Sequence, residues 1–313
     1  MLKTITELNI KIMFLNKQKG KENNDLLCYN SLENYLEKTK YFKSSFSEFE
    51  VHNVNGFNVI DESLSCEVGY KARSGEFFIQ NLVDLGVSEI VYVQPRRGYA
   101  GISLAWLCKR YGLNLTLVMP ASKEVSDHQA LCIQLGAKPL FARIAAMPNA
   151  GVLAKSYAKK TGAYFVPLGL NHPLVIAGGV RAFYDYFKDR KKPETMWSVI
   201  STGVLTRTMQ IALPETKFKA VAVARNIQHG ELGNAEFYSY HKAFNTKSDL
   251  IPTDFNCEDS YDSKGWDYLN RYGNKGDWFF SVAGNALQPD IDKKLVNSYR
   301  DWNDLKDFKK YGI

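Results

Sequence analysis

Lys71 is the first residue in this sequence whose type and setting could do chemistry. It stands in the segment GYKARSGEFF, two residues before Arg73. A lysine amine attacks a carbonyl group only when it is neutral, and burial beside another cation lowers its pKa toward neutrality. The segment therefore indicates a nucleophilic amine. A solvated lysine ahead of a helix is the alternative, and it would be preferred if Lys71 stood alone.

A second group of candidates lies in a loop of the segment QPRRGYAGISLAWLCKRYGL, between an expected strand and an expected helix. Backbone amides at a helix N-terminus bind anions, and the doubled arginine adds two guanidinium groups beside them. Alternatively, both arginines are solvated and the glycines only form a tight turn. The anion-binding interpretation gives these substrate-binding candidates: Arg96, Arg97, Gly98, Tyr99, Ala100 and Gly101.

A third loop could hold a phosphate group. It joins the strand-like MWSVIST to the helix-like LTRTMQIALP and reads Ser201-Thr202-Gly203-Val204-Leu205-Thr206. Hydroxyl groups, backbone amides and the positive end of a helix dipole all favour a dianion. The loop has a single glycine, so side chains limit how closely its backbone approaches such a ligand.

These loops lie at the joints of a regular alternation of strands and helices. Expected strands read EIVYVQP, LTLVMP, KPLFARI, MWSVIST and KAVAVA, and amphipathic segments such as SGEFFIQNLVDLG lie between them. The alternation predicts an α/β fold with parallel sheets covered by helices, which bind ligands at the carboxyl ends of their strands. Within residues 1–60 only SLENYLEKTKYF has helical spacing, after a Ser that could cap it. The irregular stretch after about residue 226 is interpreted as a cover for the active site, and a short strand, DWFFSVAG, follows it.

Composition excludes several classes of protein. No apolar run reaches the roughly 18 residues that span a bilayer, and no cleavable signal sequence is recognised, so we expect a cytoplasmic protein with no membrane partner. The five cysteines are scattered and form no C-x-x-C pair, which indicates neither a disulfide framework nor a metal site. The net charge of +7 fits an anionic partner and a solvated surface equally well.

The order of these units and motifs resembles the fold-type II pyridoxal-phosphate enzymes, the superfamily of tryptophan synthase β and cysteine synthase. The similarity covers residues 62–285 and is greatest to the branch of aminocyclopropane-carboxylate deaminase and D-cysteine desulfhydrase. It implies two open, mostly parallel twisted sheets with helices on both faces. It also implies a large cofactor-binding domain of residues 1–90 and 180–313, a small substrate-side domain of residues 91–179, and a homodimer.

The resemblance also implies roles for single residues. GYKARSGEFF is similar to the G-N-K-x-R-K-x-E-F of that branch, so Lys71 would carry pyridoxal 5'-phosphate as a Schiff base. Tyr99 stands where the family has an asparagine that touches the cofactor ring, and residues 201–206 stand where it has a glycine-rich phosphate loop. Tyr261-Asp262-Ser263-Lys264 is similar to its Y-E-G-K, which would place Asp262 at the pyridine nitrogen.

By the same resemblance, the protein would form an external aldimine with a small amino-bearing substrate and break a bond at the α carbon. Lys71 would shuttle the proton, and Tyr99 or Tyr261 could polarise a group or transfer a proton. A carboxylate at the ring nitrogen stabilises a carbanion, which favours a lyase acting by deamination with elimination or by decarboxylation over a racemase.

Two other interpretations stay open. The substrate amine could be attached to a nucleotide or nucleic acid, which the doubled arginine and the net positive charge would favour. The protein could instead be a non-catalytic family member acting as a binding protein, because Tyr99 and the glycine-poor phosphate loop depart from the family pattern.

Overall fold

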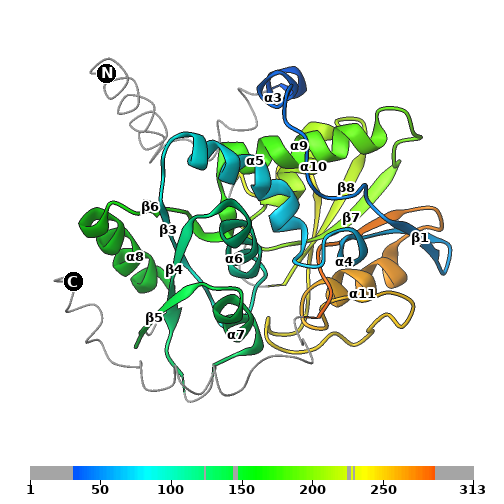
Figure 1. Ribbon diagram of the computed structural model, residues 1–313. Coiled ribbons are helices and arrows are strands. Elements are labelled where there is room, and N and C mark those ends of the chain that lie inside the picture. The colour runs from blue at the N-terminus through cyan, green and yellow to red at the C-terminus, as the bar shows by residue number, and fades with distance from the viewer. Residues whose placement is uncertain (1–30, 123–124, 144–146, 224–226, 228–229, 286–313) are drawn as a thin grey trace.

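The computed structural model describes residues 31–122, 125–143, 147–223, 227 and 230–285. A six-stranded sheet has the order β1-β2-β10-β7-β8-β9, in which β1 and β2 are antiparallel and all other neighbours are parallel (Figure 1). Its strands are β1 (Val51–Val54), β2 (Phe57–Asp61), β7 (Thr195–Ile200), β8 (Lys217–Ala222), β9 (Glu236–Ser239) and β10 (Trp278–Ser281).

A second sheet has four parallel strands in the order β5-β4-β3-β6. They are β3 (Glu89–Val93), β4 (Asn114–Pro120), β5 (Lys138–Ala142) and β6 (Tyr164–Phe165). The prediction of two mostly parallel sheets with helices is therefore confirmed. The larger sheet takes its strands from both ends of the described chain and the smaller sheet from its middle. The domain boundaries at residues 90 and 180 stay a prediction.

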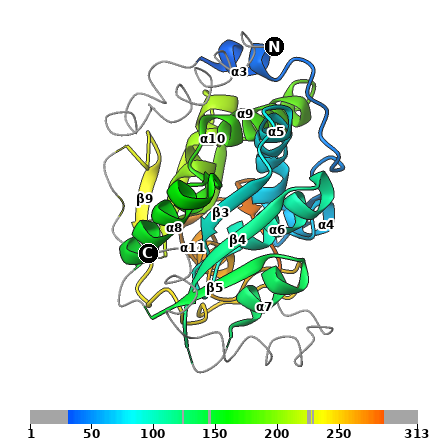
Figure 2. The ribbon, with the colours of Figure 1, turned by 60° about the vertical axis from the view of Figure 1, so that its left-hand side comes forward.

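Helices cover both faces of each sheet. Their bounds are α3 (Leu32–Lys38), α4 (Glu62–Ser65), α5 (Tyr70–Asp84), α6 (Ala100–Tyr111), α7 (Asp127–Gln134), α8 (Met147–Thr161), α9 (Pro173–Phe187), α10 (Val204–Ala212) and α11 (Asp262–Tyr272), with a 3₁₀ turn, η1, at Leu168–Leu170. In Figure 1, α9 and α10 lie above the larger sheet and α11 lies below it. Figure 2 shows β3, β4 and β5 side by side, with α8 on one side and α6 and α7 on the other.

Alternating side chains explain these layers. In β7, Met196 and Ile200 join the hydrophobic cluster that includes α9 and α10, whereas Trp197 and Val199 pack in the cluster of Trp266 from α11. Successive residues of a strand point to opposite faces, so a strand that is apolar throughout needs cover on both sides. The near-continuous apolar runs in the sequence reflect this burial.

Three strands of the larger sheet, β1, β2 and β9, and the helix α11 were not predicted from the sequence. β1 and β2 form a hairpin through Asn55 and Gly56, whose φ angles of 52° and 80° suit a two-residue turn. Farther along, the stretch after residue 226 contains β9 and the eleven-residue helix α11 in addition to irregular segments. α5 also begins at Tyr70, ahead of the segment expected to be helical, which places Lys71 in its first turn.

No helix among the described residues combines the length and the apolar composition that a membrane crossing requires. Four cysteines fall in the described part of the chain, and all are buried and unbridged: Cys66, Cys108, Cys132 and Cys257. Within the same residues, no group of three or more His, Cys, Asp or Glu side chains could hold a metal ion.

Candidate active site

A cavity of about 380 Å³ lies where the two sheets meet. The residues that follow the carboxyl ends of β3, β7 and β10 line it, together with the first turns of α5, α6, α10 and α11. Parallel sheets bind ligands at this end of their strands, because loops and helix N-termini converge there. The cavity thus brings together Lys71, most of the residues singled out in the two loops, and Tyr261 and Asp262 of the acidic motif.

Lys71 lines this cavity from the first turn of α5, and its Nζ donates a hydrogen bond to the carbonyl oxygen of Gly169 at 2.8 Å. Burial, and then the positive charge of Arg207, lower the pKa of Lys71 to about 7. The expectation that Arg73 supplies the nearby cation is wrong, since Arg73 is paired with Glu62 at 2.6 Å. The amine of Lys71 nevertheless has a pKa near neutral pH, as the chemistry requires.

Asp262 is the first residue of α11, and its side chain is fully buried at the cavity. Its Oδ2 accepts a hydrogen bond from the backbone N–H of Val282 at 3.1 Å, while Oδ1 is buried with no hydrogen-bond partner among the described residues. Burial raises the pKa of Asp262 well above its usual range. An unpaired buried carboxyl oxygen is costly, and a ligand that donates a hydrogen bond there would remove the cost.

All six residues of the phosphate-loop candidate, 201–206, line the cavity. Gly203 has a φ of 71°, and a Cβ atom there would lie 2.1 Å from the carbonyl oxygen of Glu231, so the single glycine stands where one is needed. α10 begins at Val204, and the first N–H groups of a helix have no partner within the helix. The hydroxyl of Thr206 is also buried without a partner in the described chain. The loop can therefore donate several hydrogen bonds to an anion.

The substrate-binding candidates divide into two groups. Arg97, Gly98, Tyr99 and Ala100 line the cavity, whereas Arg96 and Gly101 do not. The N–H of Gly101 donates to Oε1 of Gln94 at 3.0 Å, and a Cβ on Gly101 would lie 2.2 Å from the same atom. Gly101 therefore serves close packing.

Arg97 reaches across the cavity from the β3–α6 loop, and its Nη1 donates to Oγ of Ser260 at 2.9 Å. Ser260 in turn donates to the carboxylate of Glu258. Sequence reasoning singled out neither Ser260 nor Glu258, because both stand in the irregular stretch before α11 and match no motif. The arginine is thus held at the cavity by a hydroxyl and a nearby carboxylate.

The two candidate phenols keep their protons at neutral pH. Burial raises the pKa of both Tyr99 and Tyr261 far above the usual value. The hydroxyl of Tyr99 donates to the carbonyl oxygen of Gly284, and its ring meets His128 edge-on with centroids 5.5 Å apart. Burial, and then Arg97, lower the pKa of His128 to about 4, so this histidine is neutral. These rings can donate hydrogen bonds but carry no charge.

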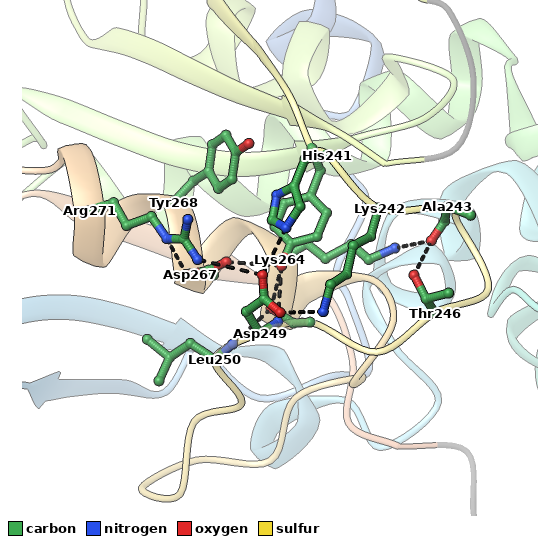
Figure 3. A network of polar contacts seen from close by, with 12 residues as sticks. His241, Lys242, Ala243, Thr246, Asp249, Leu250, Lys264, Asp267, Tyr268 and Arg271 are labelled. Carbon is green, nitrogen blue, oxygen red and sulfur yellow. Dashed lines mark hydrogen bonds and ion pairs between the residues drawn. The ribbon is translucent and has the colours of Figure 1, made fainter.

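Phe244 lines the cavity from the segment between β9 and α11, which Figure 3 shows from close by. Lys264 of α11 holds this segment, since its Nζ donates to the carbonyl oxygens of Ala243 at 2.7 Å and Phe244 at 3.1 Å. Lys264 is fully buried. The lysine of the Tyr261-Asp262-Ser263-Lys264 motif thus positions an aromatic ring at the cavity.

A surface network reinforces the same segment (Figure 3). Asp249 accepts from His241 at 2.8 Å, pairs with Lys242, and lies 3.6 Å from Nη2 of Arg271. Arg271 also pairs with Asp267 of α11 at 2.7 Å. Two further buried hydrogen bonds, from Tyr240 to Asp267 and from Ser248 to the carbonyl oxygen of Ser263, join the segment to α11. The segment interpreted as a cover is therefore fastened to α11 by several buried hydrogen bonds and by an exposed network.

The residues at the cavity fit pyridoxal 5'-phosphate. An amine with a pKa near 7 suits the aldehyde, a loop of amide and hydroxyl donors suits the phosphate, and the unpaired Oδ1 of Asp262 suits a protonated ring nitrogen. All three groups line the same cavity. Lys71, residues 201–206 and Asp262 would hold the cofactor.

Solved structures share this fold at low sequence identity. An ACC deaminase homologue is 14% identical with a TM-score of 0.70, covering 88% of this chain and 98% of that chain. Threonine deaminase isoform 2 from Solanum lycopersicum is 14% identical with a TM-score of 0.64, covering 88% and 94%. Serine racemase from Dictyostelium discoideum is 13% identical with a TM-score of 0.63, covering 82% and 99%. At such identities the similarity concerns the fold alone.

No curated protein matches the chain significantly. Residues 39–275 match the family model described as pyridoxal-phosphate dependent enzyme. This range is more than half of the chain and includes Lys71, the phosphate loop and Asp262. The chain therefore belongs to the family of pyridoxal-phosphate dependent enzymes, and its cofactor is pyridoxal 5'-phosphate.

Proposed function

We propose that the protein is a lyase that breaks a bond at the α carbon of a small amino acid, by deamination with elimination or by decarboxylation. The observation that supports this most is the buried Oδ1 of Asp262, which has no partner in the described chain and belongs to a cavity that also contains Lys71. A carboxyl group at the ring nitrogen favours reactions in which negative charge develops at the α carbon.

When bound, pyridoxal phosphate supplies a ring that withdraws electrons from the α carbon of an amino substrate. The chain's own residues supply the rest. Nζ of Lys71, with its pKa near 7, can take a proton at the α carbon and return it elsewhere. The N–H groups at the start of α6, with Arg97 beside them, can bind the substrate carboxylate. Phe244 adds an apolar ring to the lining of the cavity.

The charge balance of the cavity supports a small substrate over a nucleotide or nucleic acid. Lys71 and Arg97 line it, and so do the carboxyl groups of Glu258 and Asp262. Arg96, which the polyanion interpretation also needs, does not. The names of the matched structures, two deaminases and a racemase, agree with a small amino acid. We keep the cytoplasmic location and the homodimer as parts of the proposal.

Visible absorption tests the proposal first. Wild-type protein with pyridoxal 5'-phosphate should show a visible absorption band that Lys71→Ala abolishes, while Lys160→Ala, an exposed lysine on α8, should leave it unchanged. Each of the common amino acids, in both L and D forms, is then added. Release of ammonia or carbon dioxide with consumption of the amino acid supports a lyase.

The other outcomes separate the alternatives. Inversion of the α carbon without net consumption would identify a racemase and overturn the lyase proposal. A band that depends on Lys71, together with no change in any amino acid but a change in an aminoacylated nucleotide, would favour the nucleotide alternative. A wild-type protein that stays colourless with excess cofactor would support the non-catalytic alternative.

A further inference from the structure

Arg207 is a buried residue beside the cofactor site to which the proposed function assigns no role. It is the fourth residue of α10, directly after the phosphate loop, and only 1% of it is exposed. Burying a guanidinium group is costly unless its donors are satisfied. Its Nε donates to the carbonyl oxygen of Gly203 at 3.3 Å, and its Nη2 donates to Oδ1 of Asn171 at 2.8 Å. One side chain therefore ties the phosphate loop to the turn around η1.

The same turn accepts a hydrogen bond from the catalytic lysine. Nζ of Lys71 donates to the carbonyl oxygen of Gly169, two residues before Asn171. Gly169 has a φ of 75°, and a Cβ there would lie 2.5 Å from Oγ1 of Thr202 in the phosphate loop. Because the turn touches both Lys71 and the loop, a change at Arg207 reaches both ends of the cofactor site.

The positive charge of Arg207 also acts on both Lys71 and the phosphate loop. Arg207 is the second cause, after burial, of the lowered pKa of Lys71. The carboxylate of Glu231 and, after it, Tyr35 act on Arg207 itself and favour its charged form. The positive charge that they help to keep is buried and poorly screened, so it disfavours a neighbouring ammonium group and favours an anion on the adjacent loop. The chain thus has a cation next to a phosphate loop that contains only one glycine.

We propose that Arg207 is a positioning residue for the cofactor site: it fixes the carbonyl of Gly203 and the turn at residues 169–171, and its charge compensates for the glycines that the loop lacks. This inference rests on the proposed site, with residues 201–206 as the phosphate loop. It predicts two separate effects of Arg207, one on phosphate affinity through geometry and one on the protonation of Lys71 through charge.

The test compares binding of pyridoxal 5'-phosphate with that of pyridoxal, which has no phosphate. The titration is done at pH 9.5, where the amine of Lys71 is mostly neutral whether its pKa is about 7 or about one unit higher. There Arg207→Met should weaken pyridoxal phosphate at least tenfold and pyridoxal less than twofold, as measured by absorbance. Arg207→Lys keeps the charge but loses the planar fork, so it should lose part of the preference. Arg181→Met, which removes a partly exposed arginine paired with Asp185 on α9, is the matched control and should match wild type.

The second readout needs no cofactor. The rate of acetylation of Lys71 is followed by mass spectrometry across pH, and its midpoint reports the titration of that amine. The midpoint should rise by roughly one pH unit in Arg207→Met and stay in place in Arg207→Lys. If the Met variant fails to fold, selective loss of pyridoxal phosphate binding in the Lys variant still decides the question.

Equal weakening of both ligands in a folded variant, or full retention of the preference for pyridoxal phosphate, would overturn the inference. Failure of the proposed function looks different. In that case wild-type protein itself shows no band that depends on Lys71. Failure of this inference leaves the wild-type band in place and finds the same preference for pyridoxal phosphate over pyridoxal in Arg207→Met as in wild type.

Discussion

At the scale of residues, the site depends on how burial changes protonation. Lys71 and Asp262 line one cavity, and burial pushes each toward its neutral form: it lowers the pKa of the amine and raises that of the carboxyl group. Neutral side chains are expected in a cofactor site before the cofactor binds, because the charged groups that would pair with them belong to the cofactor. The arrangement also has a cost in stability, which can be measured.

We expect stability without cofactor to depend on pH through Lys71. Its folded pKa is about 7, whereas an unfolded lysine titrates near 10.4. Between these values the unfolded chain binds more protons than the folded one, so stability rises with pH across this window. The penalty for burying Lys71 is complete below pH 7 and is relieved as the pH approaches about 10.

The test is Lys71→Met without cofactor. At pH 6 this variant should be more stable than wild type by about 4–5 kcal/mol, and at pH 9.5 the difference should shrink by more than half. Urea unfolding at the two pH values measures it. A difference that stays constant with pH would show that Lys71 is charged in the folded protein at both.

At the scale of elements, the sequence predicted the strands and helices from residue 74 to about 224, apart from β6 and η1. Each predicted element is a clear apolar run or an amphipathic segment. The hairpin of β1 and β2 was missed although it carries a strong signal. In VHNVNGFNVI, the Asn55-Gly56 pair between two β-rich runs is typical of a two-residue turn.

α11 was missed for a different reason. Its sequence, DSKGWDYLNRY, contains a glycine and few apolar residues, so propensity argues against a helix. Tertiary packing decides instead, because Gly265 lets the helix approach Val199 and Phe279 so closely that a Cβ would lie within 3 Å of each. The resemblance identified Tyr261 and Asp262 as site residues without revealing that they begin a helix.

α11 also fastens the segment that carries Phe244, and Lys264 is the buried contact that holds the backbone at Ala243 and Phe244. Lys264→Met removes the donor to two carbonyl oxygens, and a hydrogen bond from a charged group contributes about 1.5–3 kcal/mol. We expect amide hydrogen exchange in residues 240–250 to accelerate about tenfold or more, and KM to rise with the loss of Phe244 from its place.

Lys242→Met is the control for this prediction. It breaks an exposed ion pair with Asp249 in the same segment, and such pairs contribute little. Exchange should therefore change far less than in Lys264→Met. Equal acceleration in the two variants would contradict the role of Lys264.

At the scale of the whole molecule, the cavity exists because two sheets are held together around it. Three hydrogen bonds join segments of the two sheets next to the cavity: Lys71 to Gly169, Arg97 to Ser260, and Tyr99 to Gly284. Each has a partner that lies in the loops or helix termini beyond a strand, where sequence patterns are weakest. The sequence therefore identified Lys71, Arg97 and Tyr99 as site residues but not the residues that accept their hydrogen bonds.

Tyr99 could either join the two sheets or transfer a proton in the reaction. The two roles predict different kinetic effects of removing its hydroxyl. Its hydroxyl already donates to the carbonyl oxygen of Gly284, just beyond β10 of the larger sheet, while the residue itself stands at the start of α6 beside the smaller one. A phenol engaged in this way holds the sheets at a fixed separation. We therefore expect Tyr99 to act through the geometry of the cavity.

Tyr99→Phe keeps the ring and removes the hydroxyl. We expect the free energy of unfolding to fall by about 1 kcal/mol, the typical contribution of one hydrogen bond, with a KM raised several-fold and kcat within about threefold of wild type. Tyr261→Phe, at the other phenol, is measured beside it. Loss of a general acid would instead lower kcat by about 10²–10⁴, so such a drop in either variant would identify that phenol as the proton donor. For Tyr99, it would mean that its bond to Gly284 gives way when substrate binds, and that the two sheets move relative to each other during turnover.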